Sequence, residues 1–345
     1  MAHWLQLLNI ELPIIQAPMA GAQDEELACA VAAAGGLGSL PCAMLSPAGV
    51  AEQVAQFRAR VRAPVNLNFF CHHDPAPAEQ ALSVWRKRLE PYYRELQITD
   101  DIQAAARRPF DEDMCRVVEQ LRPEVVSFHF GLPESRLLER VRASGATILC
   151  TATCVGEAQL LEAAGVHGII AQGAEAGGHR GTFSSADTDA ELGSFALIPQ
   201  IVDAVRVPVI AAGGIADARG VAAARALGAS AVQIGTAYLR CPESRISEAH
   251  RRALAAVRDD STRVTNVLTG RRARGILNRV MRELGPIAED VPPFPLLATV
   301  IAPLRSRAEA NGSGDFSPLW AGQAAALGRP SSARELTELC ASGWR

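Results

Sequence analysis

Short apolar runs of strand length alternate with alanine-rich segments of helical composition along most of the chain. Near-continuous apolarity is typical of strands covered on both faces, as in a parallel sheet. The runs lie at 13–19, 37–40, 64–70, 124–130, 147–153, 168–173, 208–214 and 231–239. Helical composition between them is clearest at 25–34, 47–61, 135–143 and 216–227. A strand-then-helix unit repeated eight times within about 250 residues predicts an α/β fold of the closed (β/α)8 type, a TIM barrel.

An open doubly wound sheet is the structural alternative. It is disfavoured because no G-x-G-x-x-G segment opens a helix directly after the first strand. Two regions depart from the repeat: a charged excursion at 72–109, with a predicted helix at 79–96, and the arginine- and proline-rich residues from 259 onward. We therefore predict a barrel over 1–258 and a mainly helical cap over 259–345, which the excursion joins over one end of the barrel.

The charge balance narrows the class of partner. The 345 residues include 34 basic and 37 acidic side chains, interspersed along the chain, for a net charge of −3. Without a basic arm the chain is not expected to bind nucleic acid, so a small molecule is the expected partner. No run of roughly 18 apolar residues and no leader segment is seen, which predicts a cytoplasmic protein that does not enter a membrane. The eight scattered cysteines predict reduced, buried thiols rather than disulfides or a metal site, and homo-oligomerisation stays open.

Polar residues at the carboxyl ends of the predicted strands carry the most information, because a barrel of this kind holds its active site there. Asparagine and glutamine are depleted from strands and costly to bury unpaired, so several at similar depth indicate a shared polar ligand. The residues in question are Asn66, Asn68, Gln172 and Gln233, together with His129. For any single one of them, a structural hydrogen bond to the backbone is an equally good explanation.

The segment QGAEAGGHRG at 172–181 follows the sixth run and contains four glycines in ten residues. Glycine permits positive φ and lets the main chain approach a ligand closely. His179 is the side chain of this segment that can accept and return a proton near neutral pH. The simpler interpretation is a turn with a surface histidine. Because catalytic histidines commonly stand on such loops, we predict that His179 is catalytic.

Two further glycine turns follow the next two strands. AAGGI at 211–215 and QIGT at 233–236 each lead into a helical segment. Turns after the seventh and eighth strands form the usual phosphate site of a barrel, because backbone amides at a helix start point outward. One such turn would only indicate a tight connection, but two adjacent ones in these units predict a bound phosphate.

These motifs together resemble the nitronate monooxygenase family, formerly called 2-nitropropane dioxygenases, in its class I bacterial branch. The similarity spans nearly the whole chain and rests on PIIQAPMAG at 13–21, AGGLGSL at 34–40, NLNFFCH at 66–72, SFHFGLP at 127–133, AQGAEAGGHRG at 171–181, AAGGIADARG at 211–220, QIGTAYLRCPES at 233–244 and GRRARGILNR at 270–279. The resemblance implies that His179 is the catalytic acid/base and that His129 lines the substrate pocket. It also implies an FMN cofactor, for which the binding residues are Ala17, Pro18, Met19, Asn68, Gln172, Gly177, Gly178, Gly213, Gly214, Gln233, Ile234, Gly235 and Thr236.

The implied reaction is the oxidation of alkyl nitronates, and of the parent nitroalkanes, with O2 to a carbonyl compound and nitrite. The family prefers propionate 3-nitronate, a toxic natural product. Its C-terminal motif of two tyrosines and a lysine is missing here, since residues 292–305 read PPFPLLATVIAPLR, with Phe294, Leu296 and Ala298 in that region. We therefore expect a more apolar substrate pocket.

Three other functions stay open at this point. An FMN-dependent reductase that uses NAD(P)H, of the enoyl-acyl-carrier-protein or quinone type, also carries an EAGGH-type segment and needs no dinucleotide fingerprint. A non-redox isomerase or lyase could use the same turns for a sugar phosphate, because a fold does not fix a function. A flavin carrier without catalysis is the third.

Overall fold

The computed structural model describes residues 2–99, 107–184 and 191–345. Eight parallel strands form one sheet in the order β1-β9-β8-β6-β5-β4-β3-β2, and a parallel bridge between Ile15 and Leu37 joins its two edges. The sheet is therefore closed, and the predicted TIM barrel is confirmed. Its strands are β1 Ile14–Gln16, β2 Gly38–Pro41, β3 Val65–Phe70, β4 Val125–His129, β5 Thr147–Ala152, β6 Gly168–Gln172, β8 Val209–Ala212 and β9 Ala231–Ile234.

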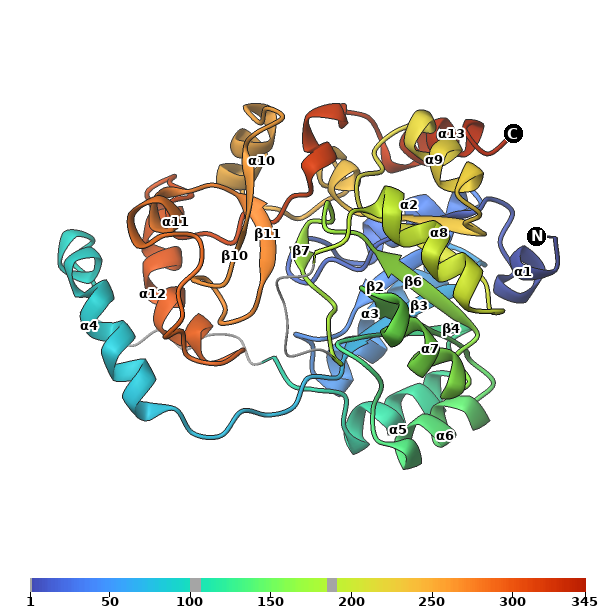
Figure 1. The fold of residues 1–345 in the computed structure, drawn as a ribbon, viewed down its shortest axis with the longest axis horizontal. Helices are drawn as coiled ribbons and strands as arrows, with labels where there is room; N and C mark the ends of the chain where they lie inside the picture. Colours follow the sequence, from blue (N-terminus) through green and yellow to red (C-terminus); the bar gives the residue numbers. More distant parts are fainter. Residues whose placement is uncertain (1, 100–106, 185–190) are drawn as a thin grey trace.

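Helices cover the outside of this barrel and bury their apolar faces against the strands (Figure 1). They are α2 Glu25–Ala33, α3 Pro47–Arg60, α5 Glu112–Leu121, α6 Ser135–Ala143, α7 Val155–Ala163, α8 Ser194–Ala204 and α9 Ala218–Ala226. Asp24, Ser46, Asp111 and Asp217 each accept a backbone N–H at a helix start, which satisfies a donor that the helix itself leaves free. The run predicted as a strand at 231–239 ends earlier, at Ile234, and continues as the 3₁₀ helix η1 Thr236–Arg240.

The last helix of the chain completes the ring. α13 Ala333–Ser342 packs against both α2 and α9, and its Leu336 and Cys340 belong to the barrel's hydrophobic cluster. This is the place of the eighth outer helix, since β9 is followed only by the short η1. The division at 258/259 stays a prediction of domain boundaries, and α13 lies on the barrel in space. At the start of the chain, α1 Ala2–Leu8 packs through Trp4 on Gly168, the first residue of β6.

The excursion and the C-terminal segment form a second lobe, seen at the left of Figure 1. Helix α4 Glu79–Glu95 of the excursion lies against α12 Leu297–Ala310, and both share a hydrophobic cluster with α11 Arg279–Leu284. The Trp85 indole donates to the carbonyl of Asp290 at 2.8 Å, so the two segments are joined by a polar contact as well. This cap has a core of its own, separate from that of the barrel.

A small antiparallel sheet connects the two lobes. It contains β10 Thr262–Thr265, β11 Ala273–Ile276 and the two-residue strand β7 Gly178–His179. In β7, His179 pairs with Ala273 of β11. The sequence predicted a mainly helical cap and placed His179 on a loop, so this sheet was missed, because a two-residue strand shows no alternation and its partner lies about 95 residues away.

The remaining helices are α10 Glu248–Ala255 and the 3₁₀ helix η2 Gln323–Leu327. Within the described ranges, no helix combines the length and apolarity needed to span a lipid bilayer. All eight cysteines are free thiols, and six of them are buried.

Candidate active site

A cavity lies at the carboxyl ends of the barrel strands, where the cap faces them. Nearly all of the predicted site residues line it: Ala17, Pro18, Met19, Asn68, His129, Gln172, Gly177, Gly178, His179, Gly213, Gly214, Gln233, Gly235 and Thr236. Ile234 does not, because neighbouring residues of a strand face opposite ways and its side chain, 1% exposed, joins the barrel core. Asn66 also lies elsewhere, since its amide donates to the Ser39 hydroxyl at 2.9 Å, one layer below Asn68.

The two glycine turns form one side of this cavity. Gly213 and Gly214 have φ of +109° and +73°, backbone conformations that other residues adopt only with strain. Gly177 faces the Gly322 backbone so closely that a Cβ atom there would meet the Gly322 nitrogen at 2.6 Å. Bulkier residues would therefore fill this part of the cavity or distort its wall. That the two turns bind a phosphate stays a prediction.

Gln172 holds the backbone of β7, the strand that contains His179. Its Nε2 donates to the carbonyl of His179 at 3.0 Å, and its Oε1 accepts the N–H of Gly181 at 2.8 Å and a guanidinium N–H of Arg180 at 3.0 Å. The same Arg180 nitrogen reaches the carbonyl of Gly173 at 2.7 Å. The glycine-rich segment is thus fixed by side chains rather than being a free loop.

His129 is fully engaged by the protein. Its Nε2 lies 3.2 Å from the carbonyl of His179, which can only accept, so Nε2 is the donor; Nδ1 lies 3.0 Å from the Thr151 hydroxyl. Burial, helped by the nearby charge of Arg271, lowers the pKa of His129 from 6.5 to about 3. This ring is a neutral support of the site wall and has no nitrogen left for proton transfer.

The ring of His179 lies in an aromatic enclosure. Trp320 and Phe294 of the cap stand edge-on to it, with ring centroids 5.4 Å and 5.2 Å away, and Phe70 and Phe130 of the barrel follow at 6.4 Å and 6.0 Å. Burial is the main reason that the pKa of His179 lies well below 6.5, and the positive charge of Arg107 adds to it. At neutral pH His179 is therefore an uncharged base in a largely apolar setting.

The chain as a whole matches the family model described as Nitronate monooxygenase over residues 2–342. It belongs to the nitronate monooxygenase family. A nitronate monooxygenase of Paraburkholderia phytofirmans is 42% identical, with 96% of this chain and 92% of that protein covered, and one of Pseudomonas aeruginosa is 40% identical, with 97% and 96% covered. Membership makes this protein an oxidoreductase, as the resemblance predicted.

Solved structures agree with this family. The nitroalkane oxidase from Streptomyces ansochromogenes has a TM-score of 0.90 at 36% identity, with 99% of this chain and 97% of that chain covered. FabK from Thermotoga maritima has a TM-score of 0.75 at 25% identity, with 99% and 95% covered. The first similarity is the higher in both fold and sequence.

The nitronate monooxygenase family consists of flavoenzymes, and the cavity fits a flavin. Gln233 lines it, and its Oε1 is a buried acceptor for which the described residues offer no hydrogen-bond donor. An orphaned buried acceptor is costly unless a ligand bonds to it. The predicted phosphate cradle, formed by the turns at Gly213–Gly214 and Gly235–Thr236, also lines the cavity. The orphaned acceptor points to a bound ligand with a polar body.

The cap wall departs from the expectation of a more apolar pocket. Aromatic rings do surround His179, but Arg107, Arg305 and Glu309 line the cavity as well. Arg305 pairs with Glu309 at 3.0 Å, whereas Arg107 has no carboxylate within ion-pair distance among the described residues. The sequence analysis missed these residues, because an arginine in an excursion gives no local signal of its target.

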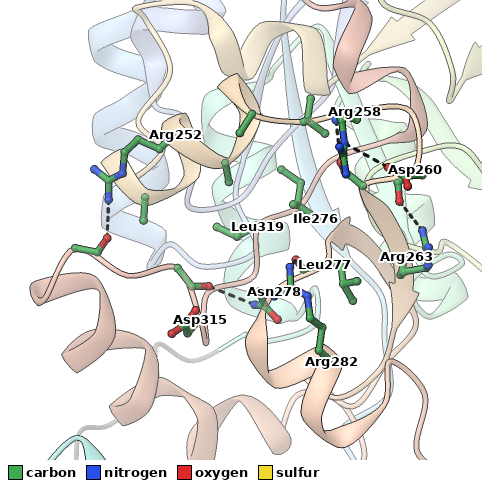
Figure 2. Close-up of a pocket in the computed structure, with 17 residues that line it drawn as sticks. Arg252, Arg258, Asp260, Arg263, Ile276, Leu277, Asn278, Arg282, Asp315 and Leu319 are labelled. Atoms are coloured by element: carbon green, nitrogen blue, oxygen red, sulfur yellow. Dashed lines mark hydrogen bonds and ion pairs between the residues drawn. The ribbon is translucent and has the colours of Figure 1, made fainter.

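A second hollow lies on the cap, between α10 and the end of β11 (Figure 2). Its arginines bond to the protein itself: Arg252 donates to the carbonyl of Gly312 at 2.5 Å and Arg263 to that of Asp260 at 2.7 Å. No histidine or cysteine stands among its lining residues. The carboxylates of Asp260 and Asp315 do line the hollow, but nearly all of the site residues predicted from the sequence line the barrel cavity and none of them lines the hollow. The barrel cavity is therefore the candidate active site.

Proposed function

We propose that this protein uses FMN and O2 to oxidise alkyl nitronates, and neutral nitroalkanes after deprotonating them, to a carbonyl compound and nitrite. The observation that carries the proposal is the His179 ring, which lies in an aromatic enclosure and lines the same cavity as the glycine turns. Burial lowers the pKa of this ring, which favours its neutral form. The nitronate monooxygenase of Paraburkholderia phytofirmans and the nitroalkane oxidase of Streptomyces ansochromogenes support the choice of substrate.

In this proposal, the residues that line the cavity bind the cofactor or exclude water. The backbone turns at Gly213–Gly214 and Gly235–Thr236 would hold the FMN phosphate, and Gln233 would donate to or accept from its polar body. Bound FMN supplies the electron transfer from substrate to oxygen. Phe70 and Trp320 exclude water from the space beside His179, which strengthens the electrostatic interactions there.

His179 performs the proton chemistry of the proposal. A neutral nitroalkane has an acidic hydrogen on the carbon that carries the nitro group, and a neutral imidazole can accept that proton. Negative charge then develops on the nitro oxygens. Arg107, for which the described residues offer no carboxylate partner, would stabilise that charge.

The decisive experiment measures products. We expect the purified protein to be yellow, to release FMN on denaturation, and to produce nitrite and acetaldehyde from nitroethane and from ethyl nitronate while consuming O2. Yellow protein that makes no nitrite from either compound would refute the proposed function.

Anaerobic mixing separates the redox alternatives. We expect ethyl nitronate to bleach the flavin absorbance and NADPH to leave it unchanged over the same time. Rapid bleaching by NADPH alone would instead identify an NAD(P)H-using reductase, and a flavin that neither compound bleaches would point to a carrier. Colourless protein that takes up no FMN would favour the non-redox isomerase or lyase.

A further inference from the structure

The imidazole ring of His179 makes its only hydrogen bond, among the described residues, with the cap. His179 Nε2 lies 3.0 Å from the hydroxyl oxygen of Thr269. Thr269 stands between β10 and β11, is 2% exposed, and is not on the barrel at all. The neighbouring strand β11 also pairs with the His179 backbone. The cap therefore holds both the main chain and the ring of this residue.

The hydroxyl of Thr269 has a second contact that fixes its direction. Its oxygen lies 3.3 Å from the carbonyl of Arg271, an atom that can only accept a hydrogen bond. If the hydroxyl donates to Arg271, its lone pairs are free to accept from His179 Nε2–H, and two hydrogen bonds form. If it donates to His179 instead, the contact with Arg271 is lost and only one forms. The first arrangement is favoured by one hydrogen bond.

The other ring nitrogen of His179 is then the reactive one. Among the described residues no group hydrogen-bonds to Nδ1, and His179 lines the cavity. With the proton on Nε2, Nδ1 carries the lone pair. In the opposite tautomer, Nδ1–H would have no acceptor in the described part of the protein, and no lone pair would be available on that side of the ring.

We propose that Thr269 is the positioning residue that keeps the proton of neutral His179 on Nε2, so that Nδ1 is the atom that accepts the proton from substrate. The inference rests on the proposed function. In this step the C–H bond beside the nitro group breaks, its proton forms a bond to Nδ1, and its electron pair stays on the substrate as the nitronate. An imidazolium with Nε2–H still donating to Thr269 is the product.

The role of Thr269 can be tested with nitroethane and ethyl nitronate, two substrates that differ by this one proton. Nitroethane requires proton removal, whereas ethyl nitronate has already lost the proton. For Thr269→Val we expect kcat/KM with nitroethane to fall about tenfold, the value of one hydrogen bond, and kcat/KM with ethyl nitronate to change less than about twofold. Thr269→Ser, which keeps the hydroxyl, should restore the rate with nitroethane.

Thr299→Val is the matched control, because the Thr299 hydroxyl also lies in the cap but donates only to the carbonyl of Leu296. We expect it to leave both rates unchanged. An equal loss on both substrates in Thr269→Val, or no loss on nitroethane, would overturn the proposal. Wild-type protein that converts neither substrate would refute the proposed function instead.

A spectroscopic measurement decides the tautomer without turnover. In holoprotein labelled with ¹⁵N-histidine, the His179 signals are assigned by their disappearance in His179→Asn. We expect the wild-type protein to show a protonated Nε2 and an unprotonated Nδ1, and Thr269→Val to shift both toward the average of the two tautomers. A wild-type spectrum with the proton on Nδ1 would overturn the inference whatever the activities are.

Discussion

The two walls of the cavity are built from different kinds of sequence. The barrel wall consists of residues in or just after the barrel strands: Asn68 lies within β3, Gln172 ends β6, and Gly214 is the second residue after β8. The cap wall consists of Arg107, Arg305 and Trp320, which come from an excursion, a helix and an irregular segment. The barrel wall is a product of local pattern, and the cap wall exists only because distant segments pack together.

The chemistry of the two walls differs accordingly. Glycine turns and amide side chains on the barrel wall suit a phosphate and a polar ring system. Thr269, Phe294 and Trp320 on the cap side contact the ring of His179. We infer that the barrel wall serves the cofactor and the cap wall serves the reacting histidine and the substrate. His179 itself belongs to both walls, since β7 follows the barrel strand β6 in the chain and pairs with β11 of the cap.

The largest expected effect comes from the residue that the two walls share. His179→Asn removes the proton acceptor but keeps a polar side chain of similar size. We expect kcat/KM with nitroethane to fall by about 10²- to 10⁴-fold, the usual contribution of a general base. Steady-state nitrite release measures the loss, and the visible spectrum should show the flavin still bound. Unchanged turnover of nitroethane would show that the proton goes elsewhere.

A change on the barrel wall should instead act on the cofactor. In Gly213→Ala, the residue must hold a φ of +109°, and its Cβ would meet the Ala176 nitrogen at 3.1 Å. Since such strain costs about 1 to 3 kcal/mol, we expect flavin to bind roughly 10- to 100-fold more weakly. Gly156→Ala on α7 is the control, because nothing lies within 4 Å of its added Cβ and its φ is not positive. Titration of the apoprotein with FMN measures both, and equal affinities would remove the cradle from the cofactor site.

The sequence was sufficient for the barrel wall because its information is local. Strand-length apolar runs locate each strand, though not its last residue, and residues near the carboxyl end of a barrel strand face the active-site cavity. The exceptions are residues for which face or depth matters: Ile234 follows Gln233 in β9 yet points into the core, and Asn66 is bonded below the cavity floor. A single sequence does not give the depth of a residue in the barrel.

The cap wall could not be predicted from the sequence pattern. Thr269 follows two apolar residues and resembles any buried threonine, and its contact with His179 depends on the pairing of β7 with β11. The missing lysine of the family motif suggested an apolar pocket, but Arg107 brings a positive charge into the cavity from the excursion. Substrate preference therefore has to be measured rather than transferred from the family.

Arg107 tests whether the cap wall holds the substrate's charge. Arg107→Gln keeps a polar side chain but removes the cation that has no carboxylate partner among the described residues. We expect KM for ethyl nitronate to rise about tenfold, the value of a charge-assisted hydrogen bond of moderate strength, with flavin affinity unchanged. Arg258→Gln is the control, since that side chain is 80% exposed and does not line the cavity. A weakened flavin with normal KM would assign Arg107 to the cofactor instead.

The smallest expected effect is on the pH dependence, and it links the two walls electrostatically. Burial first, then the charge of Arg107, with His129, Arg271 and His72 contributing, holds the pKa of His179 well below 6.5. The active form is the neutral one, so activity with nitroethane should persist below pH 6.5 and disappear as the pH falls through the depressed pKa. Arg107→Gln removes one lowering influence, and the acidic limb of kcat/KM against pH should move upward, toward 6.5 but not beyond it, because burial remains. A limb that stays in place in Arg107→Gln would mean that the cap's charge does not reach His179, and the histidine would then depend on the cap only for Thr269 and its aromatic enclosure.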